Sequence, residues 1–152
     1  MYNVDIRDLP VFHALSEENA GLLAPLADIF TCDAGRVIIQ QGSTAEYMHI
    51  ILHGRVEITY KPYDGNTITV THVDAGGVFG WSAVTGSRLY SSSAIAIEAA
   101  ECMRMRGEQI RKLCREHPEA GIAILNCLAD AVGSRWKDAH EQVRSILLHG
   151  MK

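Results

Sequence analysis

The stretch of sequence that decides the fold is Gly35-Arg-Val-Ile-Ile-Gln-Gln-Gly42-Ser-Thr-Ala45-Glu-Tyr-Met-His-Ile-Ile-Leu-His-Gly54-Arg-Val56. Two runs rich in aliphatic residues lie between its glycines, and a third run begins after Gly54. Short runs of this kind, bounded by glycine, are typical of β-strands. Glycine suits the corners between strands because its φ angle can be positive. The stretch therefore predicts short strands joined by tight turns.

Similar runs continue to about residue 105. Between Val56 and Tyr60, apolar and polar residues alternate with the period of a half-buried strand. The turn residues Asp64-Gly65-Asn66 lie between two runs and predict a hairpin. Many short strands at spacings of about 8–12 residues predict an antiparallel barrel or sandwich. Examples of the predicted strands are Val37–Ile39, Met48–Leu52, Val56–Tyr60, Thr67–Thr71 and Ser93–Ile97.

Helical patterns flank these runs. Ser16 and the two glutamates after it predict a helix start, and an apolar stripe of Leu22, Leu23, Leu26 and Ile29 follows. Pro25 is expected to kink or end this helix. After Gly107, Ile110, Leu113 and Cys114 have helical spacing, and Pro118 suits the first turn of a last helix. We expect one mainly β (α+β) domain over residues 1–152, with a barrel over about 30–106 and C-terminal helices over about 107–149.

Composition excludes several classes of protein. The chain has 152 residues and a net charge of −4. No apolar run has the length of a membrane span or of a signal peptide, so we expect a cytoplasmic protein that does not enter membranes. The mild negative charge argues against nucleic-acid binding. The four cysteines form no CxxC pair, so we expect reduced thiols, no metal site and no cofactor. No catalytic constellation is present, and we expect no enzymatic activity.

The last predicted helix carries apolar residues spaced alternately three and four positions apart. This is the seam of a coiled coil, whereas a helix packed only on its own barrel needs a shorter, wider stripe. We therefore expect a homodimer; the alternative is a helix packed wholly within its own domain. The predicted dimer seam is Ile122, Leu125, Ala129, Val132, Trp136, Ala139, Val143 and Ile146.

The glycine-punctuated stretch resembles the cyclic nucleotide-binding domain family, which includes the sensor domains of catabolite activator and FNR-like regulators. The shared pattern is a glycine turn, an aliphatic pair, Gln41-Gly42, Ala45, an aliphatic strand and then Gly54-Arg-Val56. The resemblance extends from Leu9 to the end of the long helix and includes Gly76-Gly-Val-Phe-Gly80. It implies a jelly-roll barrel (double-stranded β-helix) with an N-terminal helix and a long C-terminal dimerisation helix.

In this family the ligand phosphate binds a loop-plus-helix cassette, which here corresponds to Phe79–Ala94. Family members that bind cyclic nucleotides usually carry a glutamate and an arginine where this chain has Trp81 and Tyr90. The resemblance therefore implies a divergent cassette, similar to that of some stand-alone bacterial members, and weakened binding of cyclic AMP. Arg88 lies two residues before the arginine position, and Ser91 matches the usual small hydroxyl residue. The candidate ligand-binding residues are Gly80, Trp81, Ser82, Ala83, Arg88, Tyr90, Ser91 and Ser92.

Several of these residues have two possible roles. Trp81 either stacks on a flat group of the ligand or seals the barrel as a core aromatic, and Tyr90 either donates to an anion or caps the loop. By analogy with the family, Arg135 and Trp136 are candidates for a lid over the pocket. His49 and His53 lie about 13 Å apart if they are on one strand, so they cannot share a metal. We expect edge or surface histidines there.

The favoured function is a non-enzymatic regulatory module that binds a small molecule, a cyclic nucleotide or another small anion, and acts as a homodimer on an unknown protein partner. The alternative is a structural interaction module whose pocket no longer binds ligand. In related transcription factors the long helix leads to a DNA-binding domain, and here the chain ends at Lys152. We therefore expect no DNA-binding domain, unless the chain is a fragment of a larger regulator.

Overall fold

The computed structural model describes residues 5–131. The helical elements are η1 (Ile6–Asp8), η2 (Pro10–Phe12), α1 (Glu17–Leu23), η3 (Ala24–Leu26), α2 (Ser82–Thr85) and α3 (Gly107–Glu116), and residues 118–131 are also helical. The strands are β1 (Asp28–Cys32), β2 (Val37–Ile39), β3 (Tyr47–His53), β4 (Arg55–Tyr60), β5 (Ile68–Asp74), β6 (Val78–Phe79), β7 (Ser93–Ala96) and β8 (Ala100–Arg106).

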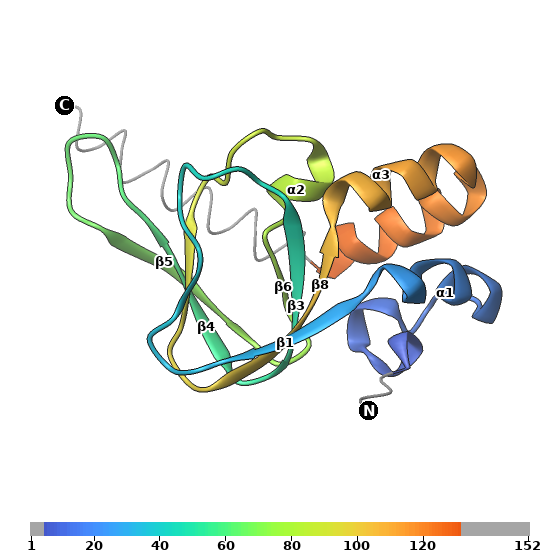
Figure 1. The fold of residues 1–152 in the computed structure, drawn as a ribbon, viewed down its shortest axis with the longest axis horizontal. Helices are drawn as coiled ribbons and strands as arrows, with labels where there is room; N and C mark the ends of the chain where they lie inside the picture. Colours follow the sequence, from blue (N-terminus) through green and yellow to red (C-terminus); the bar gives the residue numbers. More distant parts are fainter. Residues whose placement is uncertain (1–4, 132–152) are drawn as a thin grey trace.

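The strands form two antiparallel sheets of four strands each. One sheet has the order β1-β8-β3-β6 and the other the order β2-β7-β4-β5. Non-consecutive strands are neighbours in both sheets, as in a jelly roll, so the predicted mainly β fold is confirmed. Figure 1 shows the helices gathered beside the sheet that contains β1, β8 and β3, while the β4–β5 hairpin projects on the opposite side.

Two hydrophobic clusters form the core of residues 5–131. The first lies between the helices and the outer face of the β1-β8-β3-β6 sheet, and it includes Phe12, Leu23, Ile110 and Ile124. The second fills the space between the two sheets and includes Ile51, Val56, Phe79 and Cys102. The helical elements therefore cover one sheet from outside, and the barrel interior is a separate core.

Strand β3 is buried on both of its faces. Met48 and Ile50 belong to the cluster under the helices, whereas Ile51 belongs to the barrel interior. His49 is only 4% exposed and stacks on Phe79 of β6, so the expectation of an edge or surface histidine is wrong at this position. The run of aliphatic residues around His49 could have indicated its burial, because strands that are covered on both faces lack the alternation of polar and apolar residues.

The predicted alternation along β4 holds only in part. Val56 and Ile58 are buried, but Thr59 is buried as well and Tyr60 is half-buried. The register with β5 shifts between Ile58 and Thr59, and such a bulge turns the following side chains relative to the sheet. The hairpin expected around Asp64-Gly65-Asn66 connects β4 to β5.

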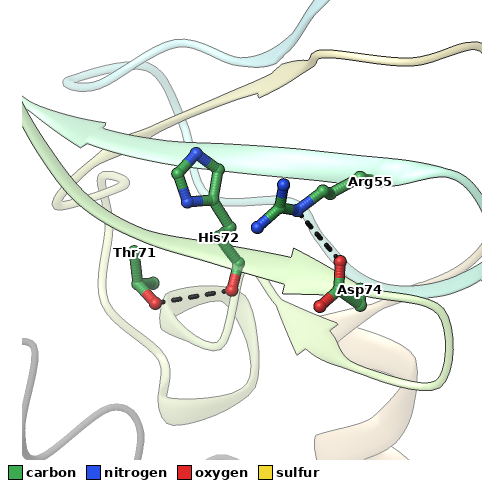
Figure 2. A network of polar contacts seen from close by, with 4 residues as sticks. All are labelled: Arg55, Thr71, His72 and Asp74. Carbon is green, nitrogen blue, oxygen red and sulfur yellow. Dashed lines mark hydrogen bonds and ion pairs between the residues drawn. The ribbon is translucent and has the colours of Figure 1, made fainter.

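At the other end of the β4–β5 pair, Arg55 lies opposite Asp74, and the Arg55 Nε–Asp74 Oδ1 distance is 3.0 Å. Figure 2 shows this ion pair beside His72 and Thr71, whose hydroxyl donates to the His72 carbonyl at 3.4 Å. Both charged side chains are substantially exposed. An exposed pair of this kind contributes at most about 1 kcal/mol, so it is a useful reference for surface ion pairs rather than a main support of the sheet.

The N-terminal helix begins and ends where the sequence predicts. The Ser16 hydroxyl accepts a hydrogen bond from the Asn19 amide, and α1 gives way to η3 at Pro25. Ile29, however, belongs to β1 and not to the helical stripe. None of the runs singled out in the sequence corresponds to β1, β6 or β8, although β8 pairs with both β1 and β3.

The C-terminal part begins with α3 and continues through the helix that starts at Pro118, as predicted. Ile110 and Leu113 of α3 are buried in the cluster under the helices. No helix within residues 5–131 has the length and apolar character needed to cross a membrane.

Candidate ligand-binding site

The cassette runs from β6 through α2 and a loop to β7, at the end of the barrel next to α3 (Figure 1). Gly80 has a φ angle of 78°, and a Cβ atom there would lie 2.9 Å from the Tyr47 carbonyl oxygen. Glycine is therefore required where the chain leaves β6. Gly86, with φ 84°, ends the four-residue helix α2 in the left-handed conformation.

A small cavity lies inside the cassette, with a volume of about 20 Å³. Its walls include six of the residues predicted from the sequence: Gly80, Trp81, Ser82, Tyr90, Ser91 and Ser92. Ala83 is buried behind this wall, and Arg88 is exposed on the loop. The cavity has room for about one water molecule, whereas ligand pockets usually measure about 300–1,000 Å³. A ligand of nucleotide size therefore requires the cassette to open.

The lining of this cavity contains no ionisable acidic or basic side chain apart from the Tyr90 phenol. Its polar groups are the hydroxyls of Ser82, Ser91, Ser92, Ser93 and Tyr90 and the indole N–H of Trp81, together with backbone groups. Several cassette amides already donate to backbone carbonyls, including that of Ala83 to Gly80 and that of Val84 to Trp81. The pocket thus offers neutral hydrogen bonds to a ligand and lacks the arginine fork that suits a phosphate.

Tyr90 fastens the cassette loop to strand β3. Its hydroxyl donates to the Tyr47 carbonyl at 2.7 Å and accepts from the Tyr47 amide at 2.9 Å. The side chain is 8% exposed, and burial raises the pKa of the Tyr90 phenol above its usual value. The phenol therefore stays protonated and keeps both bonds at neutral pH. Tyr90 caps the loop in this structure.

Trp81 stands at the boundary between the cassette and the helices. It is half-buried, lines the cavity and packs against the cluster under the helices. It also precedes Ser82, the first residue of α2, and provides no side-chain cap for that helix. Trp81 therefore closes one side of the pocket.

The cassette is in direct contact with α3. A Cβ atom on Gly107, the first residue of α3, would lie 2.0 Å from the Ala83 carbonyl oxygen. Arg111, one turn further along α3, donates to the same carbonyl. Neither residue was predicted from the sequence, because a close approach between two backbones leaves no signal there beyond the glycine itself.

A second close contact joins α3 to the helix of residues 118–131. A Cβ atom on Gly121 would lie 2.7 Å from the Cys114 Cα atom of α3. The helix of residues 118–131 therefore packs against α3 backbone to backbone. Together, Ala83, Gly107, Cys114 and Gly121 form a close-packed path from the cassette to this helix.

The helix of residues 118–131 has two apolar faces. Ile124 and Leu128 are fully buried in the core, whereas the seam residues Ile122, Leu125 and Ala129 are exposed, Ile122 by 63%. The described part of the predicted dimer seam is thus not used within its own domain. The seam residues Val132, Trp136, Ala139, Val143 and Ile146, and the lid candidate Arg135, lie outside the described residues.

Residues 5–131 contain no group of three His, Cys, Asp or Glu side chains that could hold a metal ion. All four cysteines are free thiols. Burial is the main reason why the pKa of Cys102 is raised to about 12, with smaller contributions from Cys32 and Glu101. The Cys102 thiol is therefore protonated and poorly nucleophilic at neutral pH.

Comparison with known proteins gives a consistent result. Residues 30–117 match the Cyclic nucleotide-binding domain family. The Global nitrogen regulator of Synechocystis sp. is 30% identical over 126 residues, which cover 80% of this chain and 53% of the regulator. The Cyclic AMP receptor protein of Thermus thermophilus is 25% identical over 130 residues, or 86% of this chain and 58% of the receptor. The chain thus spans somewhat more than half the length of these two relatives.

A solved structure supports the same relationship over nearly a whole chain. A Geobacter metallireducens protein classed with the cyclic nucleotide-binding proteins superposes with a TM-score of 0.76 at 27% identity, covering 86% of this chain and 95% of the other. Because the family match covers more than half of the sequence and the two sheets form the expected jelly roll, the resemblance drawn from the sequence is confirmed. The chain belongs to the cyclic nucleotide-binding domain family.

Proposed function

We propose that this chain is a non-enzymatic regulatory module that binds a small molecule in its cassette and passes the change to its C-terminal helices. The observation that carries the proposal is the contact of the Ala83 carbonyl with Gly107 and Arg111 of α3. A cassette that must open to admit a ligand moves this carbonyl, and α3 cannot stay in place when it moves. Ligand binding and helix position are then linked as two states of one element.

The ligand in this proposal is a cyclic nucleotide or another small anion. Family membership supports the first choice, and the serine hydroxyls around the cavity are suitable donors for either. Without a charged partner in the lining, a phosphate loses charge-assisted hydrogen bonds worth about 1.5–3 kcal/mol each. We therefore expect cyclic AMP to bind this chain weakly, with a dissociation constant tens- to thousands-fold above that of an arginine-containing cassette.

The partner in this proposal is a second copy of the chain, which joins along the seam of the last helix. The exposure of Ile122, Leu125 and Ala129 supports it, because a continuous apolar stripe is costly to leave in water. In a dimer, a movement of the helix in one copy can also be transmitted to the other copy. We propose that the dimer acts on a protein partner, and the net charge of −4 favours this over direct contact with nucleic acid.

The test is a fluorescence titration with cyclic AMP and cyclic GMP. A Trp136→Phe background leaves Trp81 as the only tryptophan, and the indole reports opening of the cassette directly. Saturable change at micromolar to millimolar nucleotide is expected. The double variant Trp81→Glu, Tyr90→Arg, read by calorimetry, should bind cyclic AMP at least about tenfold more tightly, because it restores both charged partners.

A second candidate function is a structural interaction module with a permanently closed pocket. The cavity volume of about 20 Å³ and the packing of Trp81 against the core favour it. In that case neither nucleotide changes Trp81 fluorescence up to about millimolar concentration, while the seam still forms a dimer. A saturable response in the wild-type chain would exclude this candidate.

A further inference from the structure

The cassette consists of two halves that have different neighbours. The α2 half (residues 81–85) contains the short helix, and the loop half (residues 88–93) leads from there into β7. Residues of both halves line the cassette cavity. Figure 1 shows α2 next to α3, whereas the β4–β5 hairpin projects on the opposite side of the barrel. The bonds that hold each half therefore decide which way the cassette opens.

The loop half is bonded to residues 41–45, which lie in the connection between β2 and β3. The Tyr90 amide donates to the Ser43 carbonyl at 2.9 Å, and the Gly42 amide donates to the Tyr90 carbonyl at 3.0 Å. The two segments are antiparallel where they meet. The two hydrogen bonds between the Tyr90 hydroxyl and β3 add to this attachment. A movement of the loop half away from the barrel would break these bonds together.

Gln41 connects the loop half to the β4–β5 hairpin. Its backbone amide donates to the Ser93 hydroxyl at 2.8 Å. Its side-chain amide forms two hydrogen bonds with the backbone of Lys61: Nε2 donates to the carbonyl at 2.9 Å, and Oε1 accepts from the amide at 2.8 Å. Lys61 directly follows Tyr60, the last residue of β4. A single half-buried side chain thus holds together two segments that lie 20 residues apart in the sequence.

The α2 half is attached to the helices instead. Within residues 5–131, the one hydrogen bond that joins it to another helix or strand is the bond from Arg111 of α3 to the Ala83 carbonyl. Its other hydrogen bonds are local. Ala83 and Val84 are buried, and Val84 and Trp81 pack in the cluster under the helices. The α2 half is therefore free to move with α3, whereas the loop half is bonded to the barrel.

We propose that Gln41 is a positioning residue of the ligand pocket, which fastens the loop half to the barrel so that the pocket opens on its α2 side. The inference rests on the proposed function, in which a ligand enters the cassette, and it gives the opening a direction. The wall of Tyr90 and Ser93 stays in place, while the α2 wall moves together with α3. Opening of the pocket therefore displaces α3 and leaves the β4–β5 hairpin where it is.

The experiment measures amide hydrogen exchange in the full chain without ligand, residue by residue, by NMR. Exchange in the native state reports local openings, so it shows whether the two halves open separately. Gln41→Ala removes both side-chain bonds to Lys61. Gln40→Ala is its matched control, because Gln40 is exposed and takes part in the local hydrogen bonds through its backbone carbonyl. Arg111→Met keeps the aliphatic stem and removes the donor to the Ala83 carbonyl.

Gln41→Ala should accelerate exchange of the Lys61, Gly42 and Tyr90 amides at least about fivefold, the factor that corresponds to one neutral hydrogen bond. Exchange of the α2 amides should not change. Gln41→Glu keeps the acceptor for the Lys61 amide and should have a smaller effect, while Gln40→Ala should have none.

Arg111→Met should give the opposite pattern, with faster exchange of the Ala83 and Val84 amides and unchanged exchange of Gly42 and Tyr90. Two results would overturn the proposal: equal acceleration of both halves by either variant, or unchanged exchange of Gly42 and Tyr90 in Gln41→Ala. A titration of the wild-type chain with cyclic AMP tests the proposed function separately. Because the exchange rates are measured without ligand, absence of nucleotide binding would not alter them.

Discussion

Removing one oxygen atom, the hydroxyl of Tyr90, tests whether this residue anchors the cassette loop. Tyr90→Phe keeps the ring but removes the hydroxyl that donates to the Tyr47 carbonyl and accepts from the Tyr47 amide, at 2.7 and 2.9 Å. Each neutral hydrogen bond contributes about 1 kcal/mol, so the loss of two should destabilise the fold by about 2 kcal/mol. For a chain of this size, that lowers the thermal midpoint by about 4–8 °C.

Thermal unfolding followed by circular dichroism measures this change. Tyr63→Phe is the matched control, because Tyr63 is 99% exposed in the β4–β5 connection and its loss of a hydroxyl should leave the midpoint unchanged. Hydrogen exchange gives a local readout, since the Tyr47 amide loses its acceptor and should exchange faster. A midpoint for Tyr90→Phe within about 1 °C of wild type, with unchanged protection at Tyr47, would refute the assignment of Tyr90 as the anchor.

Three further predictions concern other parts of the domain. The pKa of His49 is about 3 in the folded state, below its unfolded value of 6.5. The contribution of His49 to the free energy of unfolding is therefore complete above pH 6.5. Below that pH the free energy of unfolding falls by up to about 1.4 kcal/mol per pH unit. Urea titrations between pH 7 and 5 should show this loss, and His49→Asn should show less of it. Gly107→Ala should destabilise by about 1–3 kcal/mol in denaturant unfolding, because its Cβ would lie 2.0 Å from the Ala83 carbonyl oxygen; Gly21→Ala in α1, with no atom within 4 Å, should instead be neutral or stabilising. Ile122→Glu should give a monomer in sedimentation and leave the thermal midpoint of the monomer unchanged. Asn126→Glu, on the same helix, should remain dimeric. A dimeric Ile122→Glu chain would contradict the proposed seam.

The fold could be predicted from the sequence where the local signal was strong. Glycine corners, the Ser16 cap and Pro118 each reflect a backbone requirement of a single position, and all three occur where expected. β8 was missed because Ala100–Arg106 pairs with strands on both sides. The local sequence Glu101-Cys-Met-Arg-Met does not indicate which strands will pair with it. His49 was misjudged for the same reason, since its burial comes from β6 and from the aromatic residues around it.

Most of the predicted cassette residues lie around one cavity, and their role in binding a ligand stays a prediction. The cassette residues could be aligned on a family pattern, and six of the eight line one cavity. The sequence could not reveal that this cavity measures only about 20 Å³, because its volume depends on how Trp81 and Tyr90 pack. The link to α3 through Gly107 and Arg111 is likewise a long-range contact. Such contacts depend on the assembled fold and not on neighbouring residues.

In the proposed function, ligand binding in the cassette changes the position of the helices that pack behind it. The most direct measurement is amide hydrogen exchange of the full chain with and without saturating cyclic AMP, followed by mass spectrometry. We expect altered exchange in two segments, Phe79–Ala94 of the cassette and Gly107–Glu116 of α3, and unchanged exchange in the β4–β5 hairpin. A change confined to the cassette, or no change in either segment, would contradict it.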